Sequence, residues 1–71
     1  MTASNVKSVF GRAVKDKRVE MGISQEELAD RAGLHRTYIS DVERGARNSS
    51  LRSIKKLADA LQISLQLLFR F

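Results

Sequence analysis

Residues Ile23 to Gly45 carry the strongest structural pattern of the chain and read ISQEELADRAGLHRTYISDVERG. Ser24 stands three residues before Glu27, which is the spacing of a capping box, in which the hydroxyl and the carboxylate each satisfy an unpaired backbone N–H group. We therefore expect a helix from Gln25 to Ala32. Gly33 should end it, because glycine readily adopts the left-handed conformation of a helix C-terminus.

The second half of this stretch predicts another short helix, from about His35 to Arg44, closed by Gly45. Two short helices joined by a tight turn that contains Gly form a helix-turn-helix, whose core we assign to residues 24–44. No strand pattern competes with this interpretation, because the apolar residues recur at spacings of three and four along most of the chain.

The flanking sequence predicts further helices on both sides. An apolar stripe indicates a first helix from about Val6 to Met21, stopped by Gly22. After a polar loop, Ser50 can cap a fourth helix whose inward stripe is Leu51, Ile54, Leu57, Ala58 and Leu61. A final helical turn or two should follow from Ser64. We treat residues 1–71 as one all-α domain.

Length and composition exclude several classes of protein. The chain has 71 residues, no Cys and one His, so disulfides and thiolate zinc sites are excluded and His35 lacks partner ligands for a metal. So few apolar residues cannot build both a core and a deep pocket. His35, Ser40 and Asp41 are too far apart along one helix for a catalytic triad, and Glu26 and Glu27 diverge by about 100°. We expect neither an enzyme nor a cofactor.

The formal net charge of +5 is concentrated in one region. Residues 31–56 contain seven basic and two acidic side chains, and the rest of the chain sums to zero. This favours a polyanionic partner, either nucleic acid or an anionic membrane, and a solvated basic face is the alternative that charge alone leaves open. Glycines interrupt the chain too often for a membrane-bound amphipathic helix. No apolar run could span a bilayer and no secretory signal is evident, so we expect a cytoplasmic location.

Five hydrogen-bonding side chains share one stripe of the helix predicted from His35 to Arg44, namely Arg36, Thr37, Ser40, Asp41 and Arg44. A solvated helix also has a polar outer face, but long Lys and Glu side chains are more usual there. Short groups such as Thr37 and Ser40 allow close approach to another surface. The guanidinium of Arg36 matches guanine O6 and N7 in the major groove, so the stripe indicates a DNA-reading surface.

The run from Ile23 to Gly45 resembles the helix-turn-helix of phage repressors and Cro-type regulators, the XRE family. The resemblance depends on Gln25, Leu28, Ala29, Gly33, Ile39 and the ending Glu43, Arg44, Gly45. Residues 35–48, HRTYISDVERGARN, are most similar to the small controller proteins of restriction-modification systems. The likeness covers roughly Val6 to Phe69 and implies a compact five-helix, lambda-repressor-like DNA-binding domain.

The resemblance also implies roles for single residues. Base reading falls to Arg36, Thr37, Ser40, Asp41 and Arg44, and contact with the DNA backbone to Ser24, Gln25, Tyr38, Arg47 and Asn48. Asp41 departs from the family pattern because phosphates repel a carboxylate, so it either accepts from cytosine N4 or holds Arg44 or Thr37 in place. Arg18 and Glu43 match a structural ion pair that fixes the recognition helix.

The C-terminal segment, about residues 57–71, is too apolar for one small domain to cover. The predicted dimer interface comprises Leu61, Ile63, Leu65, Leu67, Leu68, Phe69 and Phe71. The resemblance likewise implies that the last two helices form a two-fold dimer, which requires a pseudo-palindromic operator. A mobile tail is the alternative.

These features predict a transcription regulator that binds double-stranded DNA sequence-specifically as a homodimer, as a restriction-modification controller protein does. The alternative is an antitoxin or antagonist module that uses its apolar C-terminal surface for a protein partner. We expect no membrane partner and no small-molecule effector, since there is no second domain. Activation or repression would depend on where the operator lies relative to a promoter.

Overall fold

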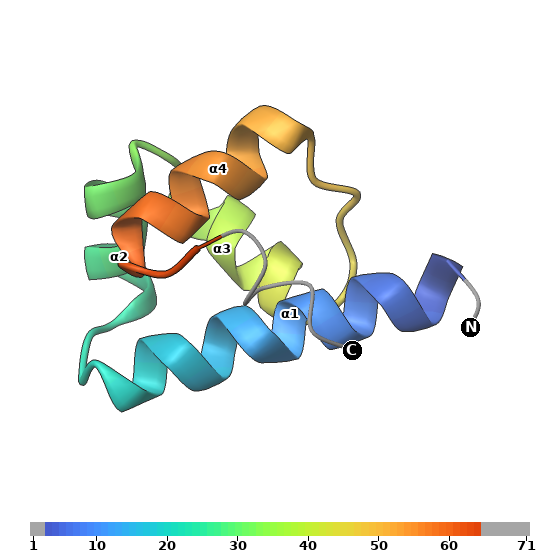
Figure 1. Ribbon diagram of the computed structural model, residues 1–71, viewed down its shortest axis with the longest axis horizontal. Coiled ribbons are helices and arrows are strands. Elements are labelled where there is room, and N and C mark those ends of the chain that lie inside the picture. The colour runs from blue at the N-terminus through green and yellow to red at the C-terminus, as the bar shows by residue number, and fades with distance from the viewer. Residues whose placement is uncertain (1–2, 65–71) are drawn as a thin grey trace.

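The computed structural model describes the backbone of residues 3–64 and the side chains of residues 6–64. Within these residues it has four helices and no strand: α1 (Ala3–Glu20), α2 (Gln25–Ala32), α3 (Arg36–Glu43) and α4 (Leu51–Ala60). The long α1 packs against α3, α3 against α2, and α2 against α4 (Figure 1). The all-helical class is confirmed. The fifth helix expected after Ser64 lies outside the described residues.

The helix-turn-helix is built by local signals. The Oγ of Ser24 accepts a hydrogen bond from the backbone N–H of Glu27 at 3.0 Å, and Gly33 ends α2 with a φ of 68°. The other half of the predicted capping box is wrong. The Glu27 carboxylate accepts from Arg31 Nε at 2.9 Å instead of reaching back to the backbone, because an oppositely charged partner one turn away competes for it.

The predicted helix ends agree with the structure to within a few residues. α1 begins at Ala3 rather than Val6, because its first residues carry no apolar signal that could reveal them. α3 begins at Arg36, with His35 at the N-cap position but without a side-chain capping bond. Ser50 caps α4 as expected, accepting from the backbone N–H of Ser53 at 3.1 Å.

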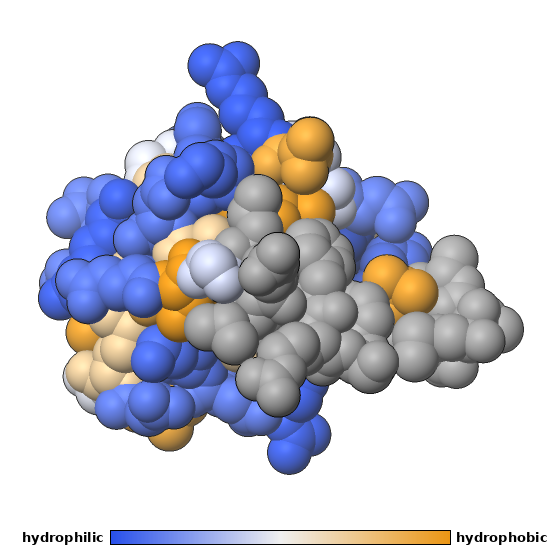
Figure 2. Space-filling view, viewed as in Figure 1, coloured by the Kyte–Doolittle hydropathy of each residue, from blue (hydrophilic) through white to orange (hydrophobic). Residues whose placement is uncertain are grey.

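The core gathers apolar side chains from all four helices. Its largest fully buried members are Leu28, Ile39, Leu57, Leu61, Val14 and Val42. Leu51, predicted to lie on the inward stripe of α4, is 72% exposed, because the first turn of α4 lies at the edge of the molecule (Figure 1). Hydrophilic residues cover most of the coloured surface in Figure 2. No described helix combines the length and apolar character needed to cross a membrane.

A glycine inside α1 determines how closely α1 and α3 approach each other. A Cβ atom on Gly11 would lie 2.1 Å from the carbonyl oxygen of Val42 and 3.2 Å from the carbonyl carbon of Glu43. Such contacts are too short for any larger residue, so the backbones of α1 and α3 meet here only because position 11 has no side chain. This contact holds the C-terminal end of α3, which carries part of the candidate site, against α1.

Candidate nucleic-acid interface

The polar stripe of α3 faces away from the core. Ile39 and Val42 are buried beneath the helix, whereas Arg36, Thr37 and Arg44 are exposed. The other two members of the stripe, Ser40 and Asp41, are half-buried. The helix therefore presents short polar groups along its middle and a guanidinium at each end, a distribution that suits close approach to an anionic groove.

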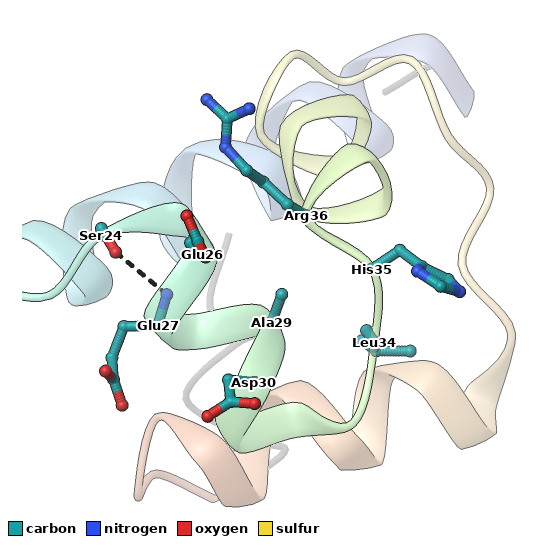
Figure 3. A pocket seen from close by; sticks show the side chains of 8 residues that line it. All are labelled: Ser24, Glu26, Glu27, Ala29, Asp30, Leu34, His35 and Arg36. Atoms are coloured by element: carbon teal, nitrogen blue, oxygen red, sulfur yellow. Dashed lines mark hydrogen bonds between the residues drawn. The ribbon is translucent and has the colours of Figure 1, made fainter.

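An open depression of about 500 Å³ separates the start of α2 from the start of α3 (Figure 3). Its wall includes Ser24 and three carboxylates of α2, and its far side is formed by Leu34, His35 and Arg36. The side chains of Arg36 and His35 point in opposite directions from the beginning of α3, as Figure 3 shows. Among the described residues, no three His, Asp or Glu side chains gather into a possible metal site.

A largely covered ion pair fixes the end of α3. Arg18 donates from Nε to Glu43 Oε2 at 2.7 Å and from Nη2 to Oε1 at 3.1 Å, a bidentate arrangement. The two side chains are only 13% and 4% exposed. Arg18 Nη1 also donates to the carbonyl oxygen of Ile23 at 2.9 Å, so the same guanidinium holds the turn before α2. Its hydrogen bonds with Glu43 raise the pKa of Arg18 above the usual value.

Gln25 belongs to this buried cluster. Its Nε2 donates to Glu43 Oε1 at 3.1 Å, so Glu43 accepts from residues of both α1 and α2. The sequence predicts Gln25 as a phosphate contact but gives no sign of its bond to Glu43, because the two residues are 18 positions apart and no spacing rule connects them. The first turn of α2 is thereby tied to the last turn of α3.

A second carboxylate on α3 engages two arginines at the surface. One oxygen of Asp41 accepts from Arg44 Nη2, and the other accepts from Arg47 Nη2 at 3.1 Å. These hydrogen bonds, first from Arg44 and then from Arg47, lower the pKa of Asp41 below its ordinary value of 3.8. Of the alternatives open for Asp41, the structure contains the contact with Arg44. The contact with Arg47 was not predicted, because the course of the loop is not readable from sequence.

The loop after α3 also contacts Tyr38. The guanidinium carbon of Arg47 lies 4.8 Å from the centroid of the Tyr38 ring, within the range of a cation–π interaction. The hydroxyl of Tyr38 is buried and has no hydrogen-bond partner among the described residues. Asn48, the other predicted backbone contact in this loop, is exposed.

The predicted dimer interface requires one correction. Leu61 is fully buried in the core of its own chain, so it offers no side-chain surface to a second copy. Its apolar character reflects the end of the inward stripe of α4. Ile63 is half-buried against the same core. Leu65, Leu67, Leu68, Phe69 and Phe71 lie outside the described residues.

Two short helices joined by a tight turn, the second with a polar stripe facing outward, define a helix-turn-helix protein. The sequence pattern of the helix-turn-helix family matches residues 14–68. The control protein C.BamHI of Bacillus amyloliquefaciens is 48% identical over 61 residues, which are 84% of this chain and 75% of that protein. The chain belongs to the XRE-type helix-turn-helix family of DNA-binding transcription regulators.

Solved structures show the same likeness. The crystal structure of the restriction-modification controller protein C.AhdI from Aeromonas hydrophila has a TM-score of 0.87 at 48% identity, covering 89% of this chain and 96% of that one. The controller protein C.Esp1396I, solved as a tetramer in complex with its natural 35 base-pair operator, has a TM-score of 0.83 at 36% identity. It covers 90% of this chain and 84% of that one.

Proposed function

We propose that this chain is a cytoplasmic transcription regulator that binds a pseudo-palindromic operator as a homodimer, in the manner of a restriction-modification controller protein. The observation that carries the proposal is the outward stripe of α3, held in place by the buried Arg18–Glu43 pair and carrying a guanidinium at its N-terminal end. The likeness to restriction-modification controller proteins supports it. The matched family is one of regulators, and we assign the chain no catalytic role.

Base reading is proposed for Arg36, Thr37, Ser40 and Arg44. Among them, Arg36 should contribute most to sequence selectivity, because a guanidinium can donate two parallel hydrogen bonds to guanine O6 and N7. Asp41 lies on the same stripe, but each of its oxygens already accepts from an arginine.

Contacts with the DNA backbone are proposed for Ser24 and Gln25 at the start of α2 and for Arg47 and Asn48 in the loop after α3. Tyr38 was also predicted to contact the backbone, but its hydroxyl is buried, so we assign its ring the role of holding Arg47. The first turn of α2 suits phosphate, because its unpaired N–H groups and the helix dipole are both positive there. Contacts of this kind set the position of a protein on DNA and make its affinity salt-dependent, whereas base contacts select the sequence.

Dimerisation is proposed for the predicted segment of about residues 57–71, with Ile63 and the apolar residues from Leu65 to Phe71 as its contacts and a fifth helix from Ser64. Leu61 is left out of the interface because it is buried within its own chain. The tetramer of C.Esp1396I on its operator supports assembly on DNA for a related protein. A two-fold dimer would place two α3 helices in successive turns of the major groove.

Selection of binding sites from a randomised duplex pool tests the proposal. We expect a palindromic sequence bound at least ~10³-fold more tightly than a scrambled duplex, because specific sites exceed non-specific ones by that factor or more. Sedimentation of the same protein should show a dimer. Enrichment of no sequence, with weak and strongly salt-dependent binding to every duplex, would refute the proposal and favour a protein-interaction module.

A further inference from the structure

The surface cluster of Asp41, Arg44 and Arg47 contains an acidic side chain where the proposed function needs positive charge. Asp41 lies between two positively charged residues that belong to different segments, the C-cap of α3 and the loop before α4. Each guanidinium donates to a different oxygen of the carboxylate. One side chain therefore connects the end of the recognition helix to the loop.

Arg47 is held on two sides. Its Nη2 bonds to Asp41 at 3.1 Å, and its guanidinium carbon lies 4.8 Å from the ring centroid of Tyr38, three positions before Asp41 on α3. The backbone supports the same geometry, since the N–H of Ala46 donates to the carbonyl oxygen of Asp41 at 2.9 Å. A long loop side chain that would otherwise sample many rotamers is thus restrained beside α3.

The carboxylate is unfavourable for DNA binding in general. A negative charge close to phosphates weakens attraction to any duplex, whatever its sequence. Arg44 and Arg47 neutralise this charge in the isolated protein, which leaves the three side chains with a formal sum of +1. The two arginines neutralise Asp41 only while each of them bonds to one of its carboxylate oxygens. A docking geometry that pulled either arginine away would uncover the negative charge of Asp41.

We propose that Asp41 is a specificity-determining positioning residue, which tethers Arg44 and Arg47 so that they fit DNA only when α3 is correctly seated in the groove. The tether lowers the entropic cost of ordering two arginines at the proper site. When the protein binds non-specific DNA, the bonds to Asp41 keep the guanidiniums of Arg44 and Arg47 away from the phosphates. This inference rests on the proposed function, because it concerns discrimination between DNA sequences.

The test replaces Asp41 by Asn, which keeps the shape and removes the charge, with Asp16→Asn as the matched control. Asp16 is exposed on α1 and paired with Arg12, so both variants gain one unit of charge, whereas D16N loses one surface ion pair and D41N loses two. For D41N, we expect tighter binding to random duplex and a loss of about tenfold in the ratio of specific to random affinity, the size expected when a charge-assisted hydrogen bond is lost. D16N should keep that ratio.

The salt dependence provides a second readout. One additional phosphate contact in D41N should steepen the slope of log K against log salt on random duplex by about 0.9. An unchanged affinity ratio in D41N, or an equal rise of both affinities in D41N and D16N, would overturn the proposal and leave Asp41 as a contributor to net charge only.

An Arg47→Ala background separates positioning from direct base reading. If Asp41 acts through its arginines, D41N should change the affinity ratio less in this background than in the natural sequence. An equal change in both backgrounds, confined to one base pair of each half-site, would overturn the proposal in favour of a carboxylate that accepts from cytosine N4.

Measurements without DNA keep this test independent of the proposed function. Exchange of the Arg44 and Arg47 guanidinium protons, followed by NMR in the isolated protein, should become faster in D41N but not in D16N, and unchanged exchange would contradict the tether. If the unmodified protein prefers no duplex at all, the proposed function fails, whereas the exchange data still report on the tether.

Discussion

Two carboxylates on the same helix of this protein are used in opposite ways. Glu43, at the end of α3, is 4% exposed and accepts from Arg18 and Gln25, which belong to α1 and α2. Asp41, two positions earlier, is 22% exposed and accepts from Arg44 and Arg47, which follow it in the chain. Each carboxylate has two donor partners, but one partner of Glu43 is a neutral amide, whereas both partners of Asp41 are charged.

The two clusters also differ in burial, and burial determines what each carboxylate can do. A carboxylate inside the protein must keep its partners, because leaving a buried charge unpaired costs several kcal/mol. Glu43 therefore fixes the angle at which α3 is presented. A carboxylate in contact with water can exchange its partners at little cost, since solvent compensates the charge. Asp41 is thus suited to respond to an approaching ligand.

The largest expected effect comes from breaking the buried cluster. Glu43→Ala should lower the free energy of unfolding by about 3 to 5 kcal/mol, because it leaves the largely covered Arg18 guanidinium without a charged partner. Urea denaturation measures the loss. Lys55→Ala, which removes an ion pair whose side chains are 61% and 62% exposed, is the control and should cost about 0 to 1 kcal/mol. Equal losses in the two variants would mean that burial does not distinguish the pairs.

A smaller effect should come from the exposed stripe, and it should fall on binding alone. Arg36→Ala should cost about 1 to 3 kcal/mol on the selected operator and relax the choice of one base pair in each half-site. Because Arg36 is exposed, urea denaturation should show little change in stability. Titration of the operator and of a scrambled duplex measures this. Equal losses on both duplexes would contradict a base-reading role.

Gln25 should affect both stability and DNA binding, since it is half-buried, bonds to Glu43 and is a proposed backbone contact. Gln25→Ala should reduce stability by about 0.5 to 1.5 kcal/mol, the net contribution of one hydrogen bond, and should leave the Arg18–Glu43 pair formed. Its effect on DNA affinity should be alike for every sequence, as for a phosphate contact. A loss confined to the selected operator would show that Gln25 reads bases.

The smallest effect concerns the titration of Asp41. Its two arginines hold the pKa below 3.8 in the folded protein, so the carboxylate favours folding above the pKa of the unfolded chain and loses this effect as pH falls through the folded pKa. Side-chain carboxyl NMR should record the low pKa, and Arg47→Ala should move it upward. No movement in that variant would show that Arg44 alone lowers the pKa.

Much of the fold could be predicted, because its signals act over a few residues. Ser24 and Ser50 begin helices through bonds to backbone N–H groups three positions on, and Gly33 ends one through its own backbone angle. The outward stripe of α3 followed from helical spacing in the same way. The pairing of Arg18 with Glu43 was implied only by family resemblance, since 25 positions separate them.

The remaining errors came from contacts between helices. Leu51 and Leu61 stand on the same predicted apolar stripe, yet one is exposed and the other fully buried. Helical spacing identifies the face on which a side chain lies, but it does not reveal how far the neighbouring helices extend beneath that face. Leu61, predicted in the interface, therefore belongs to the core.

The amino-acid sequence alone places most helix ends to within a few residues, the polar face of α3 and the concentration of positive charge, because capping, glycine conformation and helical periodicity are short-range effects. The packing of the helices, in contrast, leaves the side chain of Glu43 only 4% exposed and that of Asp41 22% exposed. That outcome depends on the close crossing of α1 and α3 at Gly11 and on the course of the loop after α3. Both bring together residues that no local rule connects.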